Sequence, residues 1–153
     1  MGYRDKLRSI LEIKETPHSI AMAFAIGVFW GMSPLLGIHT IGAFFMAWFM
    51  GLNRFVAVVG VYVTNPWTIV PIYTFSTWVG TKMMGMKQVF PDIDWGSVTF
   101  MSLMHELKEL ILPFFVGTFL IGAISAVLSY FIIRGIVARY RSSTPDVPGS
   151  ARE

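Results

Sequence analysis

Two short polar interruptions lie inside long apolar stretches of this sequence. The first is Ser33-Pro34, which Gly37 follows closely, and the second is Asn65-Pro66. Proline removes a backbone donor and clashes with the carbonyl four residues earlier, so each position predicts a kinked or broken helix. In a membrane, irregular backbone is tolerated only where protein or a water-filled cavity covers it. A chain of this kind must therefore cover both breaks.

Composition is typical of membrane proteins. Of the 153 residues, 54% are hydrophobic and only 14% are charged, whereas soluble domains average about 25% charged residues. No acid, Lys or Arg lies between Glu15 and Arg54. The net charge of +3 therefore reflects basic flanks of membrane spans, and no clustered nucleic-acid-binding face is expected. Because the chain has no cysteine, disulfides and thiol catalysis are excluded.

The apolar pattern predicts an all-α, polytopic helical membrane protein with about four membrane segments. Its helices are expected to break at Ser33-Pro34 and Asn65-Pro66, and amphipathic interfacial helices accompany them. We expect a single membrane domain over 1–141 and a disordered tail over 142–153. The predicted parts of the domain are an amphipathic N-terminal helix (1–15), a helical hairpin (17–52), a broken span (55–82), an interfacial helix (99–112) and the last span (113–137).

Each helix of the predicted hairpin carries a small residue at every fourth position. These residues are Ala23, Gly27 and Gly31 in the first helix, and Ala43, Ala47 and Gly51 in the second. Small residues at this spacing allow two helices to approach closely. The pattern predicts a seam between the two helices, but their lengths leave open whether the hairpin spans the membrane or is re-entrant.

Charge asymmetry predicts the topology. Basic residues flank both ends of the apolar region, so both termini are expected in the cytoplasm. Arg54 favours a cytoplasmic turn after the hairpin, and the segment 83–112, whose charge is nearly balanced, is expected to face outward.

The two breaks are predicted to meet, because one polar pocket can then cover the backbone groups that both release. The residues expected to line this substrate pocket are Ser33, His39, Thr40, Thr64, Asn65 and Thr68. Structural roles in the breaks and in packing are assigned to Gly27, Gly31, Pro34, Gly37 and Pro66.

Two of the pocket residues have alternative interpretations that the sequence leaves open. His39 either bonds a backbone carbonyl freed by Pro34 or meets an anionic group and carries a proton. Asn65 either caps the helix that Pro66 begins or offers its amide to a substrate. Both roles of Asn65 are compatible with each other.

Catalytic chemistry finds little support in the sequence. The three histidines are widely separated, so no metal-ligating constellation is expected. No carboxylate lies in the first three apolar runs, and no phosphate-binding, dinucleotide-binding or nucleophile-elbow motif is present. We expect neither an enzyme nor a cofactor.

Several of these residues occur together in a known family. The segment Ala25 to Thr40 (AIGVFWGMSPLLGIHT), then Asn53, then Asn65 to Thr68 (NPWT) and Tyr73 resembles a family of small bacterial membrane proteins, domain-of-unknown-function family 2062. The resemblance implies a helical protein of the bacterial inner membrane without an assigned activity. Some relatives are joined to glycosyltransferase domains.

The functional hypothesis follows from the broken helices. Half-helix N-termini can face an anionic group near the middle of a membrane. The sequence therefore favours a small inner-membrane transporter or flippase-like protein that handles an anionic lipid headgroup or small anion. Four spans enclose little space, so a homo-oligomer is expected. The alternative is a non-catalytic membrane scaffold, or a partner subunit for a lipid-linked glycan or glycosyltransferase system.

Overall fold

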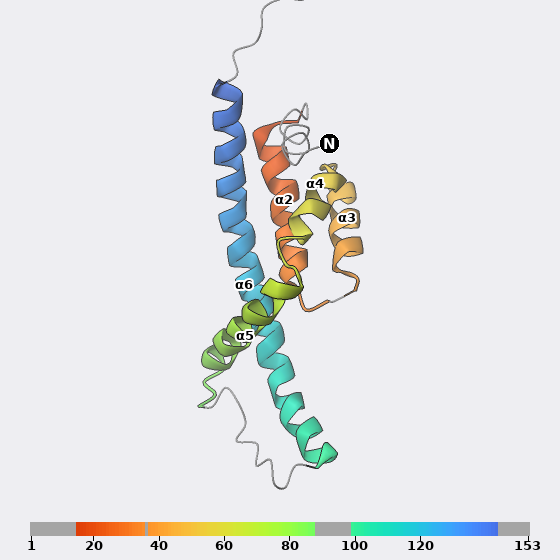
Figure 1. Ribbon diagram of the computed structural model, residues 1–153, viewed down its shortest axis with the longest axis vertical. Helices are drawn as coiled ribbons and strands as arrows, with labels where there is room; N and C mark the ends of the chain where they lie inside the picture. The colour runs from red at the N-terminus through yellow and green to blue at the C-terminus, as the bar shows by residue number, and fades with distance from the viewer. Residues whose placement is uncertain (1–14, 36, 88–98, 144–153) are drawn as a thin grey trace, which may run out of the picture.

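The computed structural model describes residues 15–35, 37–87 and 99–143, and every regular element in these ranges is an α-helix. The elements are α2 (Pro17–Met32), α3 (His39–Phe49), α4 (Arg54–Val61), α5 (Pro66–Met83) and α6 (Phe100–Ser143) (Figure 1). The all-α prediction is confirmed for this part of the chain. Apart from Glu15 and residues 142–143, the predicted N-terminal helix (1–15) and tail (142–153) lie outside the described residues.

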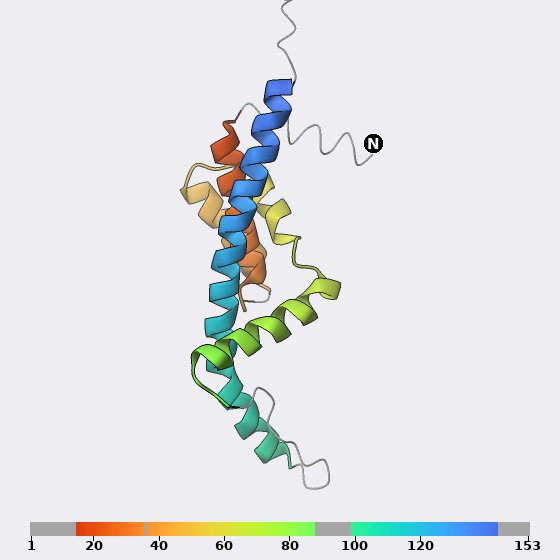
Figure 2. The ribbon, with the colours of Figure 1, turned by 90° about the vertical axis from the view of Figure 1, so that its left-hand side faces the viewer.

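The longest helix, α6, is the element against which the others assemble. Helix α2 runs antiparallel beside its C-terminal half, and α5 crosses it obliquely nearer its N-terminal end (Figures 1 and 2). The predicted interfacial helix (99–112) and last span (113–137) belong to one helix, because α6 continues through Pro113. Pro113 is fully buried against α5, so packing supports the helix where proline removes a hydrogen bond.

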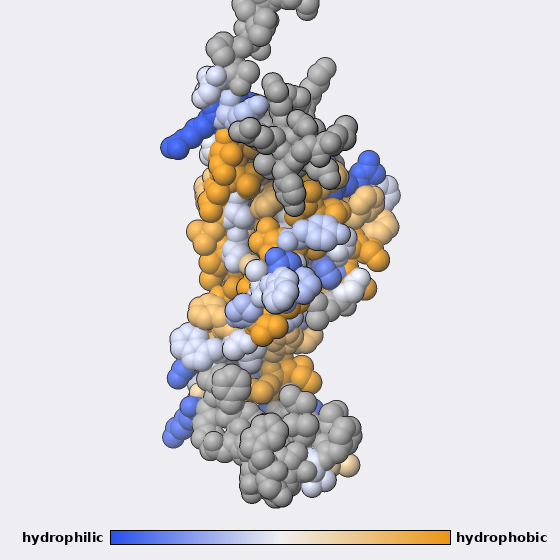
Figure 3. Space-filling model, viewed as in Figure 1, coloured by the Kyte–Doolittle hydropathy of each residue, from blue (hydrophilic) through white to orange (hydrophobic). Residues whose placement is uncertain are grey.

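One described helix is long and apolar enough to cross a membrane, namely the segment Lys108–Ser143 of α6. Its most apolar window is only 22% buried, and hydrophobic side chains cover much of the visible surface of the upper bundle (Figure 3). Helices α4 and α5 would together make a second span, bent by 74° at the break. The prediction of about four membrane segments is not confirmed, because α2, α3 and α4 are each shorter than the roughly 20 residues of a full span.

The glycines of α2 pack on α4. A methyl group added at Gly27 would collide with the carbonyl oxygen of Ala57, and one at Gly31 would lie 2.7 Å from the carbonyl oxygen of Val61. The predicted seam with α3 therefore named the wrong partner for these glycines. Helix α3 packs beside both α2 and α4 through its buried alanines, whereas Gly51 lies exposed in the turn that follows, with φ of 68°.

A second close contact fixes α5 across α6. A methyl group at Gly80 would collide with the carbonyl oxygen of Pro113, and one at Gly117 would collide with the carbonyl oxygen of Ser76. Backbone therefore meets backbone at this crossing, as the small residues allow. The oblique direction of α5 follows from this contact and from the sharp bend that separates it from α4.

The α2–α4 contact predicts a large effect of a single methyl group. Gly27→Ala should lower the free energy of unfolding by about 1–3 kcal/mol, because the chain must shift to relieve overpacking. Thermal unfolding in detergent measures this change. Gly135→Ala is the matched control, since a methyl group there meets no atom within 4 Å. Equal unfolding midpoints for the two variants would contradict the close approach of α2 and α4.

Candidate functional site

The first helix break lies at the end of α2. Ser33 takes an extended conformation, as the residue before a proline prefers, and α2 ends there. Its buried hydroxyl donates a hydrogen bond of 2.7 Å to the carbonyl oxygen of Trp30. The chain then turns through Gly37, whose φ of 93° is accessible to glycine at little cost, into α3. The amide of Gly37 donates to Nδ1 of His39 at 3.2 Å.

The second break separates α4 from α5 and ends in a complete helix cap. The side-chain oxygen of Asn65 accepts hydrogen bonds from the amides of Trp67 (2.9 Å) and Thr68 (3.0 Å). In return, the hydroxyl oxygen of Thr68 accepts a hydrogen bond of 3.0 Å from the backbone amide of Asn65, which completes a capping box. Pro66 occupies the first helical position, where its missing donor costs nothing. Asn65 therefore acts as the cap.

The two breaks lie against each other. The hydroxyl of Tyr73 on α5 donates a hydrogen bond of 3.0 Å to the carbonyl oxygen of Ser33. The hydroxyl oxygen of Thr64 lies 3.2 Å from the position that a Cβ atom on Gly31 would take. This oxygen is buried and has no hydrogen-bond partner within the described part of the chain. A polar group without a partner thus remains where the two breaks meet.

The other predicted pocket residues are placed differently. His39 and Thr40 begin α3 and are half-buried. No hydrogen bond within the described ranges joins either of them to the residues of the second break. The structure thus brings Ser33 to Tyr73 and Gly31 to Thr64, while the polar groups of Asn65 and Thr68 are occupied by their own helix.

The meeting point lies beside the apolar part of α6. The rings of Phe29 and Phe119 are 6.0 Å apart, and a Cβ atom on Gly122 would lie 3.5 Å from Cβ of Met32. Phe119 and Gly122, the two residues on α6, lie well inside the Lys108–Ser143 segment. The end of α2, where the first break begins, is therefore packed against the apolar segment of α6, whereas Asn65 and Pro66 of the second break are exposed.

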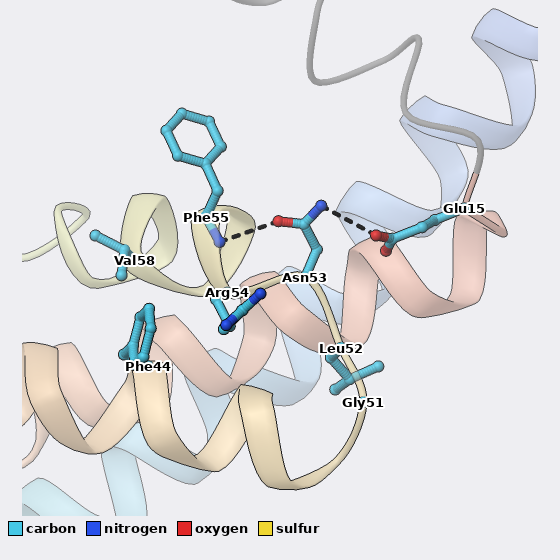
Figure 4. Close-up of a pocket in the computed structure, with 8 residues that line it drawn as sticks. All are labelled: Glu15, Phe44, Gly51, Leu52, Asn53, Arg54, Phe55 and Val58. Carbon is cyan, nitrogen blue, oxygen red and sulfur yellow. Dashed lines mark hydrogen bonds between the residues drawn. The ribbon is translucent and has the colours of Figure 1, made fainter.

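A second polar site lies at the end of α2, α3 and α4 that is farther from the helix breaks. A pocket of about 520 Å³ opens where the α3–α4 turn meets the start of α2 (Figure 4). Its lining residues are Glu15, Phe44, Gly51, Leu52, Asn53, Arg54, Phe55 and Val58.

Asn53 organises this pocket. Its side-chain oxygen accepts hydrogen bonds from the backbone amides of Phe55 (3.0 Å) and Val56 (3.2 Å). These two bonds cap α4. Its amide nitrogen donates to the Glu15 carboxylate at 3.0 Å (Figure 4). The second oxygen of this carboxylate accepts the Ser19 hydroxyl at 3.1 Å. One amide thereby joins the start of α2 to the start of α4.

The pocket holds two opposite charges that do not pair with each other. The guanidinium of Arg54 lies 5.6 Å from the centre of the Phe44 ring, within cation–π range. In the described part of the chain, Arg54 makes no hydrogen bond or ion pair. No pattern in the sequence predicts this pocket. Glu15 and Asn53 are 38 residues apart, and no local spacing signals their contact.

The family is established by comparison over most of the chain. Residues 3–144 match the model of domain-of-unknown-function family 2062, which is described as uncharacterised proteins conserved in bacteria. The chain belongs to this family. The resemblance inferred from the motifs around both breaks is thus confirmed, and Asn53 of the end pocket is among the residues that carried it. No curated protein and no solved structure matches this family 2062 chain.

A third polar cluster in this family 2062 chain joins α2 to α6. Nδ1 of His18 lies 2.7 Å from the hydroxyl oxygen of Tyr130, and the guanidinium of Arg134 lies 3.4 Å from the same oxygen. These contacts link the helices through side chains at their basic end. Among the residues described, no three His, Asp or Glu side chains gather as a metal site would require.

The contact between the breaks can be tested through one hydroxyl group. Tyr73→Phe should lower stability by about 0.5–1.5 kcal/mol, because the carbonyl of Ser33 loses its donor. Tyr62→Phe is the matched control, since Tyr62 is 68% exposed. Thermal unfolding of both variants in detergent gives the comparison. A Tyr73→Phe protein as stable as the control would contradict a role for this bond in joining the breaks.

Proposed function

We propose that this chain is a small transporter or flippase-like protein that handles an anionic lipid headgroup or a small anion where the helix breaks meet. The observation that carries the proposal is the buried hydroxyl of Thr64, which has no hydrogen-bond partner among the residues that the structure describes. Buried polar groups are nearly always paired, so an exception calls for a physical reason. A polar ligand that visits the site supplies that reason.

The chemistry around Thr64 suits a neutral hydrogen-bonding site. The first-turn amides of α5 are occupied by Asn65, so the ligand would meet side-chain hydroxyls and the positive end of the helix dipole. A hydroxyl costs far less to bury than a full charge. The Thr64 hydroxyl can therefore contact a headgroup without holding it tightly.

The proposed setting is the bacterial inner membrane, with several membrane-embedded segments and both termini in the cytoplasm. The start of α2, the α3–α4 turn and the end of α6 lie at one end of the molecule (Figure 1). This end carries Arg54 and Arg134, and the positive-inside rule assigns such an end to the cytoplasm. Among the described helices, one clear span supports this setting. A single chain of this size encloses little space, so a homo-oligomer would be needed to form a passage for a headgroup.

Cysteine labelling tests the proposed topology. Because the chain has no cysteine, Lys87→Cys and Ser143→Cys each introduce a single thiol at an exposed position. In spheroplasts, a membrane-impermeant maleimide should label position 87 directly and position 143 only after permeabilisation. Labelling of both positions from the same side would contradict a crossing by α6.

Transport is tested by removing the unpartnered hydroxyl without changing the shape of the side chain. In proteoliposomes, Thr64→Val should reduce movement of a fluorescent anionic phospholipid, or flux of a small anion, by about tenfold, the equivalent of ~1.4 kcal/mol. Its stability should stay equal or rise, because an unsatisfied group is lost. Ser76→Ala is the matched control, since it removes the other buried unpartnered hydroxyl, at the α5–α6 crossing.

Three outcomes separate the interpretations. Reduced transport in Thr64→Val with normal transport in Ser76→Ala supports the proposal. Equal transport in both variants contradicts the role of Thr64. A well-folded wild-type protein that moves neither lipid nor anion overturns the transporter, and pull-down of a glycosyltransferase would then support the scaffold alternative.

A further inference from the structure

The pocket between the start of α2 and the α3–α4 turn presents one carboxylate and one guanidinium. Among the described residues, the Glu15 carboxylate accepts hydrogen bonds from the neutral groups of Ser19 and Asn53, and no cationic side chain of this part of the chain pairs with it. Arg54 is exposed and lies against the ring of Phe44. The two charges are separate features of one cavity (Figure 4).

Each charge retains capacity for a ligand. A carboxylate offers about four acceptor positions, and two donors occupy Glu15. The guanidinium offers five donors, and none of them is used within the described residues. Its planar geometry suits two oxygens of a phosphate, while the remaining acceptor positions of Glu15 suit an ammonium group. A ligand with both groups would satisfy both side chains.

The walls of the pocket indicate that such a ligand is part of a lipid. Phe44, Leu52, Phe55 and Val58 make its apolar sides, and Phe55 is 61% exposed. Nearby on α3, Trp48 and Phe49 are 60% and 91% exposed. Tryptophan favours the boundary between headgroups and hydrocarbon, and the exposed phenylalanines add apolar surface beside it. The volume of about 520 Å³ falls within the range of small-molecule sites.

We propose that this pocket binds the phosphoethanolamine headgroup of a membrane phospholipid. Arg54 binds the phosphate, Glu15 accepts the ammonium, and the acyl chains leave along the exposed aromatic surface of α3 and α4. Asn53 positions both charged residues, because it caps the helix that begins with Arg54 and holds the Glu15 carboxylate. This site is separate from the helix breaks and does not depend on transport there.

The charge pair selects among headgroups. A phosphatidylglycerol headgroup offers a phosphate to Arg54 but no cation to Glu15, so the carboxylate opposes its binding. A phosphocholine headgroup carries a cation without N–H donors, so it cannot donate a hydrogen bond to Glu15. Phosphoethanolamine alone among these three matches both side chains.

Native mass spectrometry of the full chain in detergent tests the selection. The protein is offered equal amounts of phosphatidylethanolamine, phosphatidylcholine and phosphatidylglycerol with identical acyl chains, and bound lipid is counted. We expect phosphatidylethanolamine to be retained at least about fivefold more than either of the others, a ratio worth ~1 kcal/mol. Water-soluble O-phosphoethanolamine should compete weakly, because it lacks the apolar part. Competition equal to that of the lipid would overturn the assignment to a membrane lipid.

Two variants assign the roles of the charged residues. Arg54→Gln should weaken retention of all three lipids, since each carries a phosphate. Glu15→Gln should keep phosphate binding but remove the preference for phosphatidylethanolamine over phosphatidylcholine. Arg139→Gln is the control, because Arg139 is an exposed arginine near the same end, outside the pocket. Thermal unfolding of every variant confirms that the fold is intact.

The results that overturn this inference are distinct from those that overturn transport. Equal retention of the three lipids by the wild-type protein contradicts the headgroup selection. Arg54→Gln behaving like Arg139→Gln contradicts the assigned pocket. Neither result changes the expected loss of transport in Thr64→Val, because Thr64 does not line this pocket.

Discussion

The structure depends on satisfying backbone groups at the ends of short helices. Each break frees backbone donors and acceptors, and those that are buried must find partners within the protein. Asn53 and Asn65 supply the partners at the starts of α4 and α5, and Tyr73 reaches from α5 to the end of α2. These bonds let a small chain contain non-helical backbone beside an apolar helix. The Thr64 hydroxyl stands out because the surrounding groups are so fully paired.

Close backbone contact is the second requirement, and it compensates for the shortness of the helices. Helices of 8 to 16 residues bury too little side-chain surface to hold a fixed arrangement alone. The contacts at Gly27 and Gly117 replace bulky side chains with direct packing of backbone on backbone. Such close packing and the few side-chain hydrogen bonds between helices determine the arrangement.

Sequence reasoning located the local features well, because their causes are local. Proline predicted both breaks, and the Asn-Pro-Trp-Thr segment predicted the cap of α5. The partner of the Gly27 stripe could not be found in this way, since α3 and α4 both offer small residues and only tertiary packing selects α4. Likewise, the continuity of α6 through Pro113 depends on α5, which packs against that proline.

Long-range polar contacts could not be predicted from the sequence for the same reason. The Glu15–Asn53 bond joins residues with ordinary local roles, a helix-end acid and a cap, and only the folded bundle makes them one site.

The distribution of polar groups follows the cost of burying them. From residue 16 to residue 81, the only charged side chain is Arg54, which lies exposed at the end of the bundle with Glu15. The break deeper in the molecule contains hydroxyl and amide groups but no ionised side chain. Desolvating a full charge costs far more than desolvating a hydroxyl, so ionic groups remain at the end and neutral groups serve the interior. In the proposed function, a headgroup at the breaks would therefore meet neutral hydrogen-bonding groups and no ionised side chain. Weak contacts at depth allow passage, because a site that binds a headgroup tightly there would retain it.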